Sequence, residues 1–285
     1  MADKRGVLGN IPKVYLASFL LGLTFFGAIV VPFFLDWGKL NYAAIFTLEA
    51  AFSIAIVASE VPTGVFADKH GRKNSILVGI FLQMAGILLF LALGANFWVF
   101  LATEIIWGIS AAFISGADRA LAFDSLAEAG QEKRAKDVFA NMKIADTAGI
   151  VVAAPAGAWV AANIGTYPGS LTLPFFMTVA AFGLAFLACL TVVEPKREKS
   201  RKSGWNLAMR GFDALRQNRK LQGLAIDYVS ISAAAFFVFW FYQSILRAAY
   251  VDLSLYGWVS AAFNIAGMLV LAKLAGLEKW LGTRE

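Results

Sequence analysis

Runs of about twenty apolar residues recur along the whole of this 285-residue chain, and they constrain its fold more than any other feature. Each run is long enough to cross the hydrocarbon core of a bilayer, which is about 30 Å thick. That core offers no water to backbone N–H and C=O groups, so spanning runs of this kind have to be helical. The high share of hydrophobic residues, 59%, and the low share of charged ones, 15%, depart from a soluble domain in the same sense. The sequence therefore predicts an all-α fold, a polytopic membrane helix bundle.

Eight membrane-spanning helices are expected. The first follows Lys13 and is interpreted as a retained helix, because it is too long for a signal peptide and lacks a small-residue cleavage site. An even number of crossings puts both termini on one side. The predicted ranges are 13–35, 41–67, 74–94, 97–123, 138–163, 171–193, 222–248 and 254–275.

The positive charges indicate the orientation. With the N-terminus in the cytoplasm, every Lys and Arg except Lys39 and Arg247 falls on the inner side or at an adjoining helix end. This asymmetry predicts a multi-pass protein of the inner or plasma membrane with both termini cytoplasmic. It also explains the net charge of +6 as a topology signal, so no nucleic-acid partner is expected.

One long polar stretch divides the chain into three parts. Residues 1–193 hold six predicted helices, 194–221 form a cytoplasmic linker, and 222–285 hold two further helices. Within the linker, the apolar residues of 205–215 fall on one helical face, opposite Lys and Arg. We expect there either an amphipathic helix on the inner membrane surface or one packed under the bundle.

A ten-residue motif lies between the second and third predicted helices. It reads Gly64-Val-Phe-Ala-Asp68-Lys69-His70-Gly71-Arg72-Lys73. Gly64 would permit close helix approach and Gly71 a tight reversal, while Asp68 would cap the turn or pair with Arg72. Lys69 and Lys73 would anchor the loop at the anionic inner surface.

This motif resembles the G-x-x-x-D-[RK]-x-G-R-[RK] signature of the major facilitator superfamily (MFS), and it occupies the same loop. The resemblance implies an MFS-type six-helix half plus two helices of a second half, with a loop that latches the halves together. It also implies that Asp124 pairs with the loop arginine. Members have twelve or fourteen helices, so this chain looks like an N-terminal eight-helix portion of one.

Six acidic residues lie within predicted helices, where each charge is costly enough to need a reason. Glu49 and Glu60 share one face of 41–67, and Glu104 and Asp118 share one face of 97–123. The deep pair, Glu49 and Glu104, has no cation near it in sequence and predicts a proton or substrate site. Glu60 and Asp118 lie nearer the inner end, where pairing with Arg72, Arg119 or Lys143 is the alternative. The two shallower candidates are Asp146 and Asp227.

Other features carry less weight. Arg247 is expected to snorkel to the outer interface. Tyr242, Gln243 and Asn264 would line a cavity or simply pack. Neither cofactor nor metal is predicted, because the chain has one cysteine, Cys189, and one histidine, His70.

Two functions from different classes stay open at this point. The first is secondary transport of a small solute by alternating access, proton-coupled, with efflux of a cationic or amphiphilic solute slightly favoured over uptake. The second is a truncated, transport-incompetent remnant or scaffold that needs a partner, or self-association, to supply the missing helices. An enzyme is not expected, because no catalytic constellation appears in the sequence.

Overall fold

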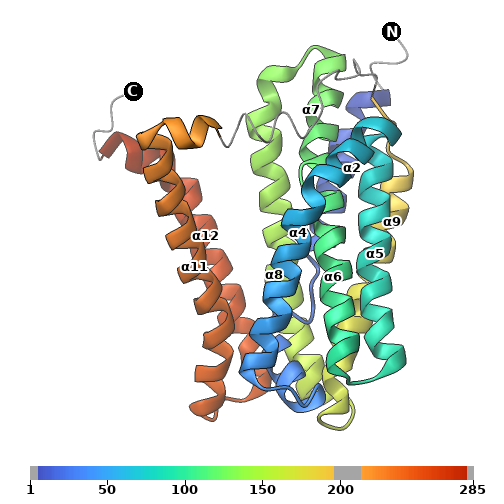
Figure 1. Ribbon diagram of the computed structural model, residues 1–285, viewed down its shortest axis with the longest axis vertical. Helices are drawn as coiled ribbons and strands as arrows, with labels where there is room; N and C mark the ends of the chain where they lie inside the picture. The colour runs from blue at the N-terminus through green and yellow to red at the C-terminus, as the bar shows by residue number, and fades with distance from the viewer. Residues whose placement is uncertain (1–5, 196–212, 281–285) are drawn as a thin grey trace.

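The computed structural model describes residues 6–195 and 213–280, the last ten of these by their backbone only, and every regular element in this part is a helix (Figure 1). Within the described residues, seven helices are long and apolar enough to cross a membrane, one fewer than predicted, because the helix of the first crossing ends at Gly22. Most of the predicted amphipathic segment 205–215 lies outside the described residues. The elements are α2 (Asn10–Gly22), α3 (Val30–Pro32), a π-helical turn (Phe33–Trp37), α4 (Tyr42–His70), α5 (Arg72–Leu93), α6 (Phe97–Ile114), α7 (Ala117–Ala129), a 3-10 turn (Glu132–Arg134), α8 (Ala135–Asn163), a second 3-10 turn (Gly169–Thr172), α9 (Leu173–Leu190), α11 (Arg219–Ala248) and α12 (Leu253–Trp280).

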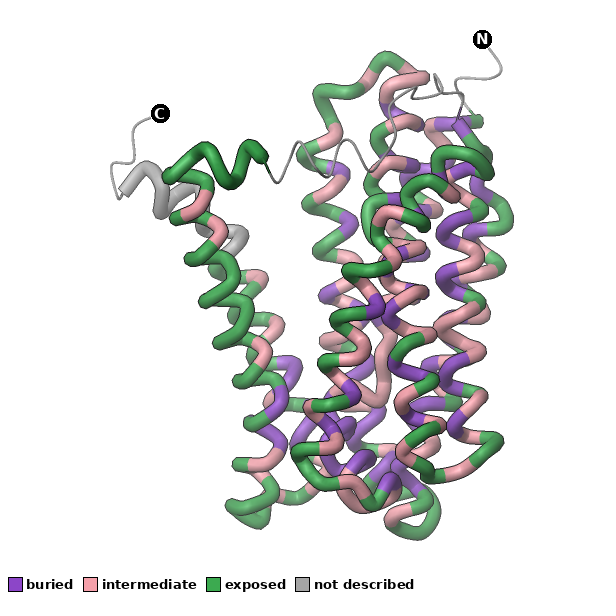
Figure 2. Tube along the Cα trace, viewed as in Figure 1, coloured by how far each residue is buried: buried purple, intermediate pink, exposed green. Residues whose placement is uncertain are grey.

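The bundle has two distinguishable ends. We call the end that holds the α4–α5 turn the inner end, following the predicted topology, and the opposite end the outer end. At the inner end α11 and α12 lean away from the other helices (Figure 1). Buried residues concentrate among α2, α5 and α9 and thin out along α11 (Figure 2).

The first crossing differs from the continuous helix predicted over 13–35. Residues 23–29 between α2 and α3 are not regular helix, because partners from other helices replace the intrahelical hydrogen bonds. The backbone N–H of Phe25 donates to Thr178 Oγ1 at 3.0 Å. Gln243 on α11 accepts from the N–H of Val31 and donates to the carbonyl of Gly27, both at 3.0 Å. The unwound segment is thus held in place by side chains far away in sequence.

Glycines on α8 and α6 allow the close helix approaches that surround this segment. A Cβ on Gly149 or Gly157 would overlap the backbone of the first crossing, at Phe19 and Phe25 respectively. A Cβ on Gly108 of α6 would lie 2.6 Å from the carbonyl oxygen of Phe52 on α4. The expected small-residue packing of α6 is therefore present.

The remaining helix ends shift by a few residues from the prediction, with one further break. The predicted helix 97–123 is divided at Ser115 and Gly116, and it continues as α7 to Ala129. Gly116 takes a φ of +77°, which an L-residue rarely adopts.

Candidate functional site

The motif loop forms the inner turn between α4 and α5. Asp68 pairs with Arg72 at 2.9 Å, one helical turn apart in sequence, and Arg72 Nε lies 3.8 Å from Asp124 on α7. Both pairings are those expected from the sequence. Together they join the motif loop to α7, so the loop has a fixed position on the bundle.

Glu194, which the sequence reasoning did not single out, is the main partner of this loop. Its two carboxylate oxygens accept from the backbone N–H groups of Arg72 at 2.7 Å and Lys73 at 2.9 Å. These are unpaired donors of the first turn of α5, where a negative charge is also favoured by the helix dipole. The Lys73 ammonium in turn donates to the carbonyl of Leu190, the last residue of α9.

Gly71 makes this capping possible. Its φ of +108° produces the predicted reversal, and a Cβ there would lie 2.9 Å from the Glu194 carboxyl carbon. Gly64 behaves differently from the expectation. No atom lies within 4 Å of where its Cβ would be, so it makes no close helix contact within the described residues.

The two deep carboxylates share a cavity of about 370 Å³ between α4, α6 and α11. Glu49 comes from α4 and Glu104 from α6, and both line this cavity. Glu104 is only 4% exposed. No cationic side chain lines this cavity among the described residues, and its walls are largely aromatic, including Trp107 and Trp240. The arrangement brings together the pair that the helix faces predicted.

A second cavity of about 620 Å³ lies toward the inner end and adjoins the first. Gln83 and Ala111 line both cavities, while Asp118, Lys143 and Asp146 line only the second. The two cavities therefore share part of their walls.

The predicted partners of the shallower carboxylates were partly wrong. Lys143 pairs with Asp146 at 2.7 Å, its neighbour one turn away, instead of with Asp118 or Glu60. Asp118 lies in the first turn of α7, and its carboxylate accepts the backbone N–H of Arg119 at 2.6 Å. Neither it nor Glu60 has an ion pair within the described part of the chain.

Glu60 and Asp227 lie apart from both cavities. Each is exposed on the surface of its helix, Glu60 on α4 and Asp227 on α11, and neither lines a described cavity. A shared helix face with Glu49 did not bring Glu60 into the site, because the inner half of α4 has no neighbour on that side among the described residues.

Arg247 does not snorkel as expected. It forms an ion pair with Asp36, the two NH groups donating to the two carboxylate oxygens at 2.7 and 2.9 Å. The Tyr167 hydroxyl, from the loop between α8 and α9, donates to the same carboxylate. This cluster joins α11 to the first six helices at the outer end.

Two known proteins of one organism match part of this chain in sequence. "Multidrug resistance protein 2" of Bacillus subtilis (strain 168) is 27% identical over 164 residues, which is 58% of this chain and 38% of that protein. "Uncharacterized MFS-type transporter YqjV" of the same organism is 33% identical over 149 residues, 50% of this chain and 32% of that protein. The chain thus matches well under half the length of these relatives.

The structural comparison concerns the fold alone. The crystal structure of a D-xylose-proton symporter superposes with a TM-score of 0.68 at 13% sequence identity, over 96% of this chain and 70% of that one. None of these comparisons favours a membrane scaffold over a transporter.

The sequence pattern of the superfamily covers nearly the whole chain. The pattern described as "Major Facilitator Superfamily" matches residues 7–284, which include the motif loop, the deep carboxylates and both helices α11 and α12. The chain belongs to the Major Facilitator Superfamily.

Proposed function

We propose that this chain works in a proton-coupled secondary transporter that moves a small solute by alternating access and favours efflux. The observation that carries the proposal is the placement of Glu104. Its carboxyl group is buried beside Glu49, in a cavity without a cation among the described lining residues. Two carboxylates that share such a site cannot both keep their charge without a large cost in free energy. Binding a proton removes that cost, so the pair is suited to carry protons.

The inner cavity supports the proton route. A group that loads and unloads protons has to reach water on each side in turn. Gln83 and Ala111 lie where the cavity of the deep carboxylates meets the inner cavity, which is lined by Asp118 and Asp146. In this conformation the carboxylates exchange protons with the cytoplasmic side.

Two features support the other parts of the proposal. The relative named for multidrug resistance supports efflux. The charge asymmetry of the loops supports a location in the inner or plasma membrane. Residues 1–193 and 222–285 serve as the two parts that move against each other during transport. Apolar side chains exposed on α4, such as Ile54 and Val57, face lipid or neighbouring helices.

The experiment uses the full-length protein in inside-out membrane vesicles. A panel of labelled neutral and cationic solutes is offered with an acidic lumen, so that protons leaving the vesicle drive an exported solute inward. We expect at least one solute to accumulate, and Glu104→Gln to abolish the accumulation while exchange of labelled for unlabelled solute continues without a gradient. Glu60→Gln, the exposed carboxylate on α4, is the control and should leave accumulation unchanged.

The outcomes separate clearly. If the Glu104→Gln variant still accumulates the solute, Glu104 is not the proton site. Failure of the acidic lumen to drive any member of the panel would overturn proton-coupled efflux itself.

A further inference from the structure

A short segment without regular secondary structure follows α9 at the inner end of the bundle (Figure 1). We call this segment, residues 191–194, the strap. The Val192 side chain is 4% exposed, and Pro195, directly after the strap, is also buried. Glu194, which caps the first turn of α5, therefore lies between two points at which the chain is buried.

Asn10, the first residue of α2, binds both backbone groups of one strap residue. Its amide oxygen accepts from the N–H of Val193 at 2.9 Å, and its amide nitrogen donates to the carbonyl of Val193 at 2.7 Å. The same nitrogen donates to Ser125 Oγ on α7 at 3.0 Å. These bonds fix the orientation of the amide, because the N–H needs an acceptor and the carbonyl needs a donor.

The position and burial of Asn10 indicate that its amide serves the strap. An asparagine at the start of a helix often caps that helix, but no side chain caps α2, and the Asn10 amide bonds to the strap and to α7 instead. Asn10 is completely buried, so its amide would be costly to keep in this place without those partners.

Two lysines bind the chain just before Val193. The Lys13 ammonium, on α2, donates to the carbonyl of Thr191, and the Lys73 ammonium, on α5, donates to the carbonyl of Leu190 at 2.7 Å. Carbonyl groups at the end of a helix lack partners within that helix, and the helix dipole favours a cation beside them. All of these partners of the strap belong to the first six helices.

We propose that Asn10 is the positioning residue of the motif loop. It fixes Val193, and the strap then holds the Glu194 carboxylate against the N-terminus of α5. On this inference the motif loop keeps its place through contacts within residues 1–195, whatever position α11 and α12 take. The inference goes beyond the proposed function, because it concerns residues apart from both cavities and depends on neither a solute nor a proton.

The test measures amide hydrogen exchange of the full-length protein in lipid nanodiscs, read residue by residue by mass spectrometry. The reporters are the amides of Arg72 and Lys73, which donate to Glu194. The reference is the amide of Gly94 at the other end of α5, which bonds within its own chain segment. Asn10→Leu should speed exchange of the reporters about tenfold relative to the reference, the effect of losing a charge-assisted hydrogen bond. A general loss of stability would speed exchange of all three amides alike.

Two further variants calibrate this result. Asn163→Leu, at the end of α8, is the matched control, because its amide donates to a carbonyl one turn earlier in its own helix. It should leave the ratio of exchange rates unchanged. Glu194→Ala removes the acceptor itself and should give the largest change. If Asn10→Leu fails to fold, Lys13→Met takes its place and should speed exchange of the reporters about threefold.

A cut in the linker tests whether the strap acts independently of the second part of the chain. A protease site is inserted between Ser200 and Arg201, beyond the strap, and the protein is cleaved in the nanodisc. Exchange at Arg72 and Lys73 should stay as slow as in the uncut protein, because the partners of the strap belong to the first six helices.

Two results would overturn the inference. One is an unchanged exchange ratio in the folded Asn10→Leu or Lys13→Met variant. The other is release of the reporter amides by the cut alone. Neither measurement involves Glu104 or a gradient, so proton-driven accumulation of a solute is decided separately.

Discussion

Arg247 on α11 and Asp36 beyond α3 are 211 residues apart in sequence and form a two-bond ion pair at the outer end of the bundle. The Tyr167 hydroxyl donates to the same carboxylate. At the inner end, by contrast, α11 leans away from the first six helices (Figure 1). The ion pair therefore joins α11 to the first crossing at the end of the bundle where the two parts lie together, and we expect it to hold them in contact there.

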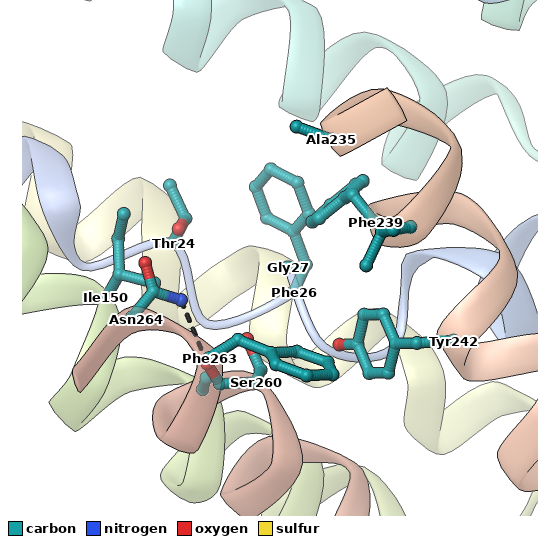
Figure 3. A pocket seen from close by; sticks show the side chains of 12 residues that line it. Thr24, Phe26, Gly27, Ile150, Ala235, Phe239, Tyr242, Ser260, Phe263 and Asn264 are labelled. Carbon is teal, nitrogen blue, oxygen red and sulfur yellow. Dashed lines mark hydrogen bonds between the residues drawn. The ribbon is translucent and has the colours of Figure 1, made fainter. Parts of the chain in front are cut away.

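Reversing either charge of this pair should open the outer end. Asp36→Arg or Arg247→Asp places like charges opposite each other, and the double variant restores attraction. The readout is the labelling rate of Ala235→Cys in a Cys189→Ser background, by an impermeant maleimide added on the outer side. Ala235 lines the cavity between the first crossing, α8, α11 and α12 (Figure 3). Each single variant should raise the labelling rate about three- to tenfold, because losing a charge-assisted pair shifts a two-state equilibrium by about 1 kcal/mol.

The double variant should return the labelling rate to that of the starting protein. Ala95→Asp, which adds a charge at an exposed residue between α5 and α6, serves as the control. Equal labelling in all variants would show that the pair does not hold the outer end closed.

Tyr167 should remain protonated well into the alkaline range. Burial, and then the hydrogen bond to Asp36, raise the pKa of its hydroxyl above the ordinary value of 10.0. A group whose pKa is raised by folding contributes its full stabilisation below the ordinary pKa, and the contribution is lost as the pH rises through the higher value. An ultraviolet titration of tyrosinate, taken as the difference between the starting protein and Tyr167→Phe, should show no ionisation of this residue below about pH 10. Ionisation in the difference spectrum below that pH would contradict the hydrogen bond.

Gly71 should tolerate a side chain less well than Gly94. Both residues have backbone angles that L-residues rarely adopt, with φ of +108° and +81°, so alanine at either one costs about 1–3 kcal/mol in strain. At Gly71 the new Cβ also meets the Glu194 carboxyl carbon at 2.9 Å, whereas at Gly94 nothing lies within 4 Å. Thermal unfolding in detergent should therefore show a larger loss for Gly71→Ala than for Gly94→Ala.

A double variant isolates the role of Glu194 in this effect. Glu194→Ala by itself removes the cap of α5 and should cost about 0.5–2 kcal/mol. The stability loss of the double variant Gly71→Ala/Glu194→Ala should be smaller than the sum of the two single losses. In the double variant the new Cβ at position 71 no longer meets the Glu194 carboxyl group. Strict additivity would mean that Glu194 does not occupy the space beside Gly71.

Hydropathy was sufficient to predict most of the fold. The positions of α4, α5, α6, α8 and α9 follow from the length of each apolar run, since a bilayer leaves such a run little choice of conformation. The motif loop was also predictable, because Asp68, Gly71 and Arg72 act on one another within a single turn. The deep pair of Glu49 and Glu104 was predictable from helix periodicity alone.

The features that could not be predicted from the sequence depend on contacts between residues far apart in the chain. Residues 23–29 look as apolar as any helix, and what unwinds them is hydrogen bonding to Thr178 and Gln243, which lie more than 150 residues later. Glu194 reaches the N-terminus of α5 across 122 residues. Arg247 finds Asp36 only once α11 has docked. Contacts of this kind depend on tertiary packing, and no local pattern encodes them.

Gln243 should therefore be essential to the first crossing. It is fully buried, and its amide joins the N–H of Val31 to the carbonyl of Gly27, so one side chain satisfies both ends of the unwound segment. Gln243→Leu keeps the volume but leaves two buried backbone groups unpaired, at about 1–3 kcal/mol each. The expected results are a lower midpoint of thermal unfolding and faster amide hydrogen exchange in residues 23–31. Gln222→Leu, at the inner end of the same helix, should change neither, because its amide donates to the local carbonyl of Arg216 and not to the first crossing. If Gln243→Leu matched Gln222→Leu in both measurements, the unwound segment would have to be stabilised by Thr178 and the α8 glycines instead, and α11 would contact the first crossing without fixing its shape.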